Sequence, residues 1–168
     1  MKLKDYPFIC PEPFVNVENT TKGVYKPCCV VHNWNPRKNK NISQYHTIEN
    51  SSFKQFYDSP EMKRLRNAMK QNNDKEFIND ICKVCIEQEQ SGNRSHRQFY
   101  IDRFTQGDFK DYKTRLENII ENNTPPDFYV SVEMDGLGGN GCNLSCSMCS
   151  ASLSSTYQKE AIALKELP

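Results

Sequence analysis

The feature of this sequence that most constrains its fold is the spacing of its cysteines. The chain carries eight cysteines among 168 residues. They fall into three groups: Cys10 with Cys28 and Cys29, then Cys82 with Cys85, then Cys142, Cys146 and Cys149. In a secreted domain such groups indicate disulfides, whereas in a reducing cytosol they more often bind metal or carry out redox chemistry. The compartment therefore decides what these cysteines do.

The N-terminus and the overall composition favour the cytosolic alternative. The opening residues, MKLKDYPFICPEPFV, lack the uninterrupted apolar stretch of a secretory signal. No apolar run approaches the ~20 residues that a membrane-spanning helix needs. We therefore expect a cytoplasmic protein with no membrane partner. The balance of 22 basic against 21 acidic residues gives no electrostatic reason to expect nucleic acid as a partner.

The third cysteine group has the strongest chemical pattern, C-x3-C-x2-C over Cys142, Cys146 and Cys149. Three thiolates at this spacing can wrap an iron–sulfur cubane from one short loop, because each reaches a different iron. One iron is then left without a protein ligand and can accept a substrate or cofactor. A structural zinc site is the alternative, but zinc usually takes four ligands, often from C-x2-C pairs. The pattern therefore favours a [4Fe–4S] cluster.

The segment CNLSCSMC, set between a predicted strand and a predicted helix, resembles the cluster loop of the radical S-adenosylmethionine (SAM) superfamily. The resemblance implies that Cys142, Cys146 and Cys149 are the catalytic cluster ligands, with SAM chelating the open iron. Met148 is implied to pack near the adenine. In this family the reduced cluster cleaves SAM to a 5′-deoxyadenosyl radical. The surrounding residues look like members that act on peptides or other macromolecules, with a reducing partner such as flavodoxin or ferredoxin.

The other cysteines resemble a second, auxiliary cluster unit. Cys10, Gly23 and Cys28 fit C-x12-G-x4-C, and Cys82 with Cys85 adds a C-x2-C pair. This resembles the opening half of the SPASM domain, or its shortened twitch form, which binds an auxiliary [4Fe–4S] cluster. The resemblance implies ligation by all four thiolates and a role in electron relay. The unit precedes the radical SAM loop here, whereas SPASM domains usually follow the barrel. A zinc ribbon with the same four ligands is the alternative.

Two short apolar-rich runs near the N-terminus predict a β-hairpin. They cover Pro13–Glu18 and Val24–Val31, and Gly23 supplies a positive φ angle at the turn. On the second strand the adjacent Cys28 and Cys29 are expected to point to opposite faces. Only one of them then reaches the site of Cys10. We favour Cys28, with Cys29 as the alternative.

Helical patterns follow the hairpin, after a polar stretch at 32–57 that we expect to be a loop with short ordered pieces. Ser59 and Pro60 predict a helix start, and Met62, Leu65 and Met69 form its apolar stripe. Further helices are predicted over Glu87–Phe104, over Asp111–Asn122 and after the third cysteine group, where Leu153, Tyr157, Ala161 and Leu164 recur at helical spacing. We expect surface positions for the three histidines (His32, His46 and His96) and for the charged residues Glu87, Glu89, Arg94, Arg97 and Arg103.

The order of these elements predicts an α+β fold in two parts. Residues 1–124 are expected to form a twitch-like cluster domain of a hairpin plus helices. Residues 127–168 supply one strand, the cluster loop and one helix, which is the first β/α unit of a partial radical SAM barrel. The pair Pro125–Pro126 marks the boundary. A radical SAM core has about six such units. We therefore expect either a truncated chain or a second polypeptide that completes the barrel.

Three functions from different classes are consistent with this sequence. The first is the N-terminal portion of a radical SAM enzyme that modifies a peptide or protein. The second is an iron–sulfur module that transfers electrons without SAM chemistry. The third is a zinc-binding interaction protein. Metal content separates the third from the others, and reductive SAM cleavage separates the first from the second.

Overall fold

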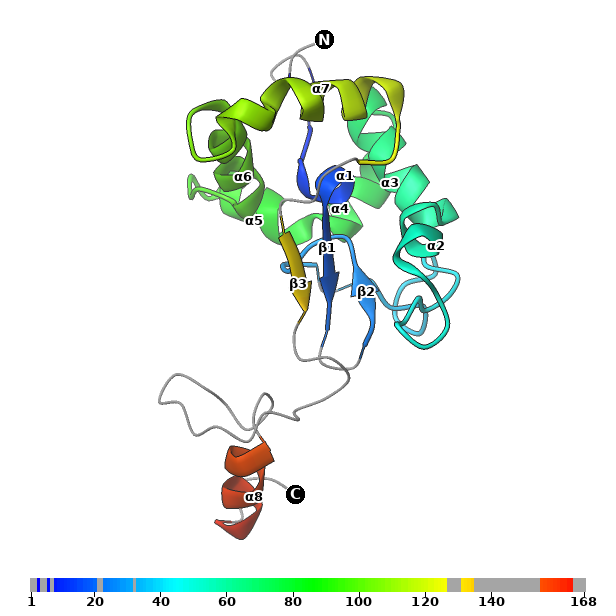
Figure 1. Cartoon of the computed structure of the whole chain (residues 1–168), viewed down its shortest axis with the longest axis vertical. Helices are drawn as coiled ribbons and strands as arrows, with labels where there is room; N and C mark the ends of the chain where they lie inside the picture. Colours follow the sequence, from blue (N-terminus) through cyan, green and yellow to red (C-terminus); the bar gives the residue numbers. More distant parts are fainter. Residues whose placement is uncertain are drawn as a thin grey trace.

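The chain has a mixed α+β fold in which a small sheet lies below a set of helices (Figure 1). The computed structural model describes residues 3, 6, 8–20, 23–31, 33–126, 131–134 and 155–164. Its elements in chain order are α1 (Glu12–Val15), β1 (Asn16–Asn19), β2 (Tyr25–Lys26), α2 (Phe53–Tyr57), α3 (Pro60–Gln71), α4 (Lys75–Ile81), α5 (Lys83–Gln90), α6 (His96–Thr105), the 3-10 turn η2 (Lys110–Tyr112), α7 (Lys113–Asn122), β3 (Ser131–Met134) and α8 (Ser155–Ala163).

The three described strands form one sheet in the order β2-β1-β3. Strands β1 and β2 pair antiparallel, with Glu18 opposite Lys26, and Gly23 turns between them at φ +71°. The predicted hairpin is thus confirmed. Strand β3 lies parallel to β1, with Asn16 opposite Ser131. The predicted strand before the cluster loop therefore joins the sheet of the hairpin, while the division into two domains stays a prediction.

The second hairpin strand is much shorter than predicted. It ends at Lys26, because Pro27 follows and has no N–H to donate to the ladder. Cys28 and Cys29 consequently lie in a turn after β2, and the prediction that they alternate on a strand is wrong. The directions of the two side chains are therefore set by this turn and not by the alternation of a strand.

The first run, Pro13–Glu18, is also only partly extended. Its opening residues form the helical turn α1, and β1 begins at Asn16. Proline accounts for the turn, because Pro11 already has helical φ and ψ of −62° and −34°, and Pro13 fixes a compatible φ. Both Phe14 and Val15 are fully buried in this turn.

Helix α3 forms as the sequence predicts. The hydroxyl of Ser59 accepts a hydrogen bond from the backbone N–H of Met62, and Pro60 occupies the first turn. The apolar stripe of Met62, Leu65 and Met69 is buried, with each side chain at most 1% exposed. Helix α7 also matches its prediction, because Leu116, Ile119 and Ile120 all enter the core.

The helix predicted over Glu87–Phe104 is in fact two helices. Helix α5 ends at Gln90, where Gly92 takes up a φ of +74°. Ser95 then starts α6 with a capping box, in which its hydroxyl accepts from the N–H of Gln98 and the Gln98 side chain accepts from the Ser95 N–H. This break turns α6 back along the core, where Tyr100 and Phe104 are buried.

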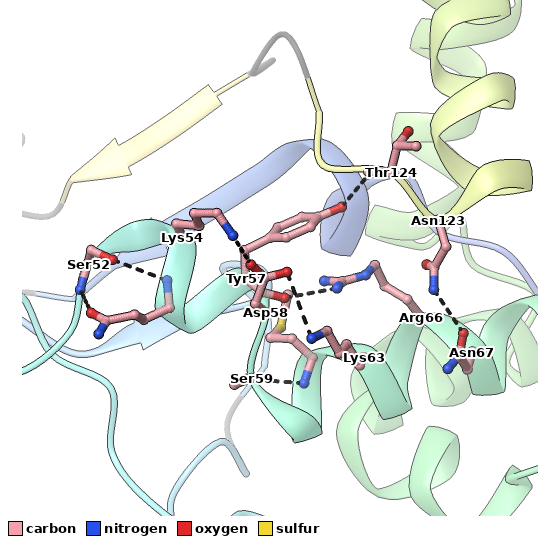
Figure 2. Close-up of polar contacts among 12 residues, drawn as sticks. Ser52, Lys54, Tyr57, Asp58, Ser59, Lys63, Arg66, Asn67, Asn123 and Thr124 are labelled. Atoms are coloured by element: carbon pink, nitrogen blue, oxygen red, sulfur yellow. Dashed lines mark hydrogen bonds and ion pairs between the residues drawn. The ribbon is translucent and has the colours of Figure 1, made fainter.

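Tyr57 contacts three parts of the fold through its hydroxyl, its ring and its backbone carbonyl (Figure 2). Its hydroxyl donates to the carbonyl oxygens of Phe14 in α1 and Thr124 beyond α7, each at 3.4 Å. The buried guanidinium of Arg66 covers the Tyr57 ring at 3.9 Å and donates to the Tyr57 carbonyl at 2.9 Å. Close by, Asn123 donates to Asn67 of α3. The segment after α7 is thereby fixed to α1 and α3.

A single apolar cluster joins β1 to the surrounding helices. Its fully buried side chains include Phe14, Val15, Phe56, Met62, Phe77, Phe104, Leu116 and Ile120. The predicted C-terminal helix is present as α8, in which Ala161 is buried, while Leu164 just beyond it is 68% exposed. Within the described part of the chain, none of the helices is long and apolar enough to cross a bilayer.

Candidate metal centre

Four cysteines from distant parts of the sequence line one cavity. Cys10, Cys28, Cys82 and Cys85 all contribute to its wall. The rest of the wall is largely apolar and includes Pro13, Val30, Leu65, Met69, Ile81 and Val84. The free space between the side chains is about 20 Å³, room for about one water. A larger group therefore requires the four side chains to move apart.

Two helix ends and two turns position these thiols. Cys82 joins two helices, since it caps the C-terminus of α4 and the N-terminus of α5. Cys85 follows three residues later on α5, which brings both side chains to one helix face. Cys10 lies two residues before the helical turn α1, and Cys28 lies in the turn that follows β2. The hairpin and the α4–α5 junction thus meet at the cavity.

Burial changes the acidity of the thiols. Burial raises the pKa of Cys10 and of Cys28 well above the usual value, and the nearby Glu12 carboxylate raises both further. Burial, followed by the neighbouring Cys85, raises the pKa of Cys82 to about 12. None of these described cysteines forms a disulfide. In the absence of metal these three thiols are therefore neutral, and metal binding must release their protons.

The spacing of the four sulfur atoms is wider than a single tetrahedral ion requires. Zinc–sulfur bonds of about 2.3 Å place two thiolates roughly 3.8 Å apart. Among the described residues, Glu12, Cys29 and His96 place three potential ligand atoms within 4.8 Å of one another. No three sulfur atoms of the cavity cysteines lie that close together. A cubane places a separate iron at each thiolate and needs a still wider spacing, which the four side chains reach only by moving apart.

Arg97 reaches this cavity. The sequence prediction that it lies on the surface is therefore wrong. Its side chain is 13% exposed and forms a bidentate ion pair with Glu89, whose side chain is 21% exposed. A third guanidinium nitrogen donates to the carbonyl of Ile9 at 3.3 Å, and the group covers the Phe8 ring at 4.5 Å. Arg97 thus holds the backbone next to Cys10 and brings a positive charge to the cavity wall.

A second group of potential ligands lies beside the cavity, around His96. The Nε2 atom of His96 is 3.3 Å from Cys29 Sγ and 3.6 Å from Glu12 Oε2. Hydrogen bonding to Cys29, and then to Glu12, raises the pKa of His96 to about 10. The expectation of a surface histidine is wrong here, because α6 turns its first residue toward α1. Sequence spacing could not indicate this group, since 67 residues separate Cys29 from His96.

His46 is also buried, contrary to the sequence prediction, and is only 6% exposed. One ring nitrogen contacts the Gln44 amide and the other contacts the Ser51 hydroxyl. The ring packs edge-on against Phe56, with a centroid separation of 5.8 Å. Its polar neighbours in the sequence are its hydrogen-bond partners in the fold, so a polar stretch was no sign of exposure.

The four residues of the radical SAM loop, Cys142, Cys146, Met148 and Cys149, lie outside the described residues, as does His32. The assignment of this loop therefore stays a prediction from its sequence pattern. Comparisons with protein-family models, with curated proteins and with solved structures gave no match. The cysteine pattern and the four-cysteine cavity are therefore the features that bear on function.

Proposed function

We propose that this chain is the iron–sulfur portion of a radical SAM enzyme, in which Cys10, Cys28, Cys82 and Cys85 hold an auxiliary [4Fe–4S] cluster. The observation that carries the proposal is that these four thiols line one buried cavity. They come from sequence positions up to 75 residues apart, counted from Cys10 to Cys85. A common ligand accounts for the convergence of four cysteines from such distant positions.

The side chains around the cavity suit such a cluster. All four donors are soft sulfur atoms, which iron in these clusters requires. The wall is largely apolar, which limits the access of water to a bound cluster. The guanidinium of Arg97 also lies at the wall, where it is paired with Glu89. Tetrahedral zinc would also require rearrangement, since no three of the cavity sulfur atoms lie within 4.8 Å of one another.

The SAM-dependent part of the proposal comes from the sequence. Cys142, Cys146 and Cys149 are the proposed ligands of the second [4Fe–4S] cluster, with Met148 beside the adenine of SAM. The two groups together would supply one-electron chemistry: relay at the auxiliary site and reductive cleavage of SAM to a 5′-deoxyadenosyl radical at the loop. The proposed substrate is a peptide or protein, and the proposed electron donor is a flavodoxin or ferredoxin. The rest of the barrel would come either from a longer form of this chain or from a second polypeptide.

The test is anaerobic reconstitution with iron and sulfide, followed by electron paramagnetic resonance of the reduced protein with and without SAM. The proposal predicts two cluster signals, of which one changes on addition of SAM. Two unchanged signals would instead favour an electron-transfer module without SAM chemistry. Bound zinc without acid-labile sulfide would favour the zinc-binding interaction protein and contradict the proposal.

A further inference from the structure

In the group around His96, a single ring nitrogen contacts two side chains. The Nε2 atom of His96 lies 3.3 Å from Cys29 Sγ and 3.6 Å from Glu12 Oε2. A single imidazole N–H cannot point well at both, since a hydrogen bond weakens steeply when it bends. The arrangement as it stands therefore leaves one of the two contacts poorly satisfied.

Glu12 is the partner whose contact with His96 is poorly satisfied. Its side chain is 1% exposed, and Oε2 has no hydrogen-bond partner, although it is completely buried. The other carboxylate oxygen, Oε1, accepts a hydrogen bond of 2.9 Å from the amide of Asn16. The nearest cationic group is His96, whose Nε2 at 3.6 Å is too far from Oε2 for a normal hydrogen bond. A buried carboxylate oxygen that accepts no hydrogen bond is costly, and a bound metal ion would satisfy it. The Asn16 contact fixes the carboxylate in the way that second-shell partners orient metal ligands.

We infer that Glu12, Cys29 and His96 form a second metal site, separate from the four-cysteine cavity, which takes one divalent ion of the zinc class. The three ligand atoms lie within 4.8 Å of one another. Metal–ligand bonds of 2.0–2.3 Å at tetrahedral angles place neighbouring ligand atoms about 3.4–3.6 Å apart. The two distances around His96 agree with that spacing to about 0.2 Å.

The mixture of ligands selects the kind of ion. One thiolate, one imidazole and one carboxylate suit zinc or another late first-row divalent ion. Calcium and magnesium prefer oxygen ligands throughout, so they do not fit. Three protein ligands leave a fourth position for water or a substrate atom, as in catalytic rather than structural zinc sites. His96 also lines the four-cysteine cavity, so the ion would lie against its wall.

Cobalt(II) is the probe for this site, because its visible and thiolate charge-transfer absorption reports four-coordinate binding. The reconstituted full-length chain is titrated with cobalt under anaerobic conditions, and bound cobalt and iron are counted together. Wild type is expected to bind one cobalt per chain with a weak, single-thiolate charge-transfer band. His96→Gln and Cys29→Ser are expected to weaken this binding at least about tenfold. The iron content is expected to stay unchanged in Cys29→Ser, because Cys29 lies outside the lining of the four-cysteine cavity.

His46→Gln is the matched control, since it changes another buried histidine with different partners. It is expected to bind cobalt like wild type, and circular dichroism checks that each variant is folded. Glu12→Gln keeps the shape of its side chain and supplies a further variant if His96→Gln does not fold. Absence of cobalt binding by wild type, or equal binding by folded His96→Gln and Cys29→Ser, overturns the inference.

The result separates this site from the auxiliary cluster. If the chain takes up no iron and sulfide but still binds a cobalt ion that depends on His96, the proposed function fails and this inference holds. If iron and sulfide bind while cobalt does not, this inference fails and the proposed function holds. Loss of iron in Cys29→Ser would make Cys29 a cluster ligand and overturn the separation of the two sites.

Discussion

Cys28 and Cys29 are adjacent in the sequence but face different ligand groups. Cys28 lines the cavity of Cys10, Cys82 and Cys85, whereas Cys29 Sγ lies 3.3 Å from His96 Nε2 and outside that lining. Pro27 ends the strand before them, so a turn rather than a strand separates their side chains. The two cysteines therefore offer a direct comparison of the two proposed sites.

Changing Cys28→Ser is expected to remove the auxiliary cluster, because serine oxygen is a poor substitute for a thiolate on iron. About half of the iron and sulfide of the reconstituted chain should be lost. Cys29→Ser is the control and should retain nearly all of it. Iron and sulfide assays on both variants make the comparison, and the reverse pattern would exchange the roles of the two cysteines.

Arg97→Ala is expected to lower the free energy of unfolding by about 1–3 kcal/mol, because the partly buried Glu89 loses its cationic partner and keeps the hydrogen bond from the Ser95 hydroxyl. It also removes the hydrogen bond to the Ile9 carbonyl next to Cys10. Urea denaturation measures the change. Arg94→Ala is the control, since Arg94 and Asp102 are 57% and 50% exposed and should contribute at most about 1 kcal/mol. Equal losses in the free energy of unfolding for the two variants would mean that the Arg97–Glu89 pair stabilises the fold no more than an exposed ion pair does.

Gly23→Ala and Gly92→Ala should both destabilise the fold, but to different extents. Both glycines have positive φ, at +71° and +74°, which costs about 1 kcal/mol for alanine. A Cβ at Gly23 would also come within 3.0 Å of Ile48, whereas at Gly92 it meets nothing within 4 Å. The loss for Gly23→Ala is therefore expected to be about 2 kcal/mol. Thermal or urea denaturation that ranks Gly92→Ala as the more damaging change would contradict this account of the hairpin turn.

His46 should make the stability depend on pH. Burial lowers its pKa below the ordinary value of about 6.5, with the nearby Glu61 opposing the shift. Below about pH 6.5 the unfolded state binds the proton more readily, so stability falls as the pH falls, by at most about 1.4 kcal/mol per unit. His46→Gln should lose this part of the slope between about pH 5 and 6.5. Identical slopes in urea denaturation of the two proteins would rule out a buried neutral histidine.

Local signals in the sequence predicted a good part of the fold. The Ser59–Pro60 start of α3 depends on neighbouring residues alone, and the buried stripe of α7 follows from helical spacing. The break between α5 and α6 was also marked locally, by Gly92 and by the Ser95–Gln98 capping pattern. The charged residues on both sides of the break favoured a prediction of one helix.

The candidate site was only partly predictable. The pattern of Cys10, Cys28, Cys82 and Cys85 indicated a common ligand before any geometry was known, and the four side chains do line one cavity. The group of Glu12, Cys29 and His96 has no such pattern, because it arises only when α6 packs its first residue beside α1. Contacts of this kind depend on tertiary structure and leave no spacing in the sequence.

The central claim is that the four cavity cysteines hold a [4Fe–4S] cluster without help from the C-terminal loop. The most direct test is iron and acid-labile sulfide analysis of the chain in which Cys142, Cys146 and Cys149 are all changed to alanine. We predict about four iron and four sulfide per chain, which are lost when Cys85→Ser is added. Zinc without sulfide in the triple variant, or no bound metal at all, would contradict the claim.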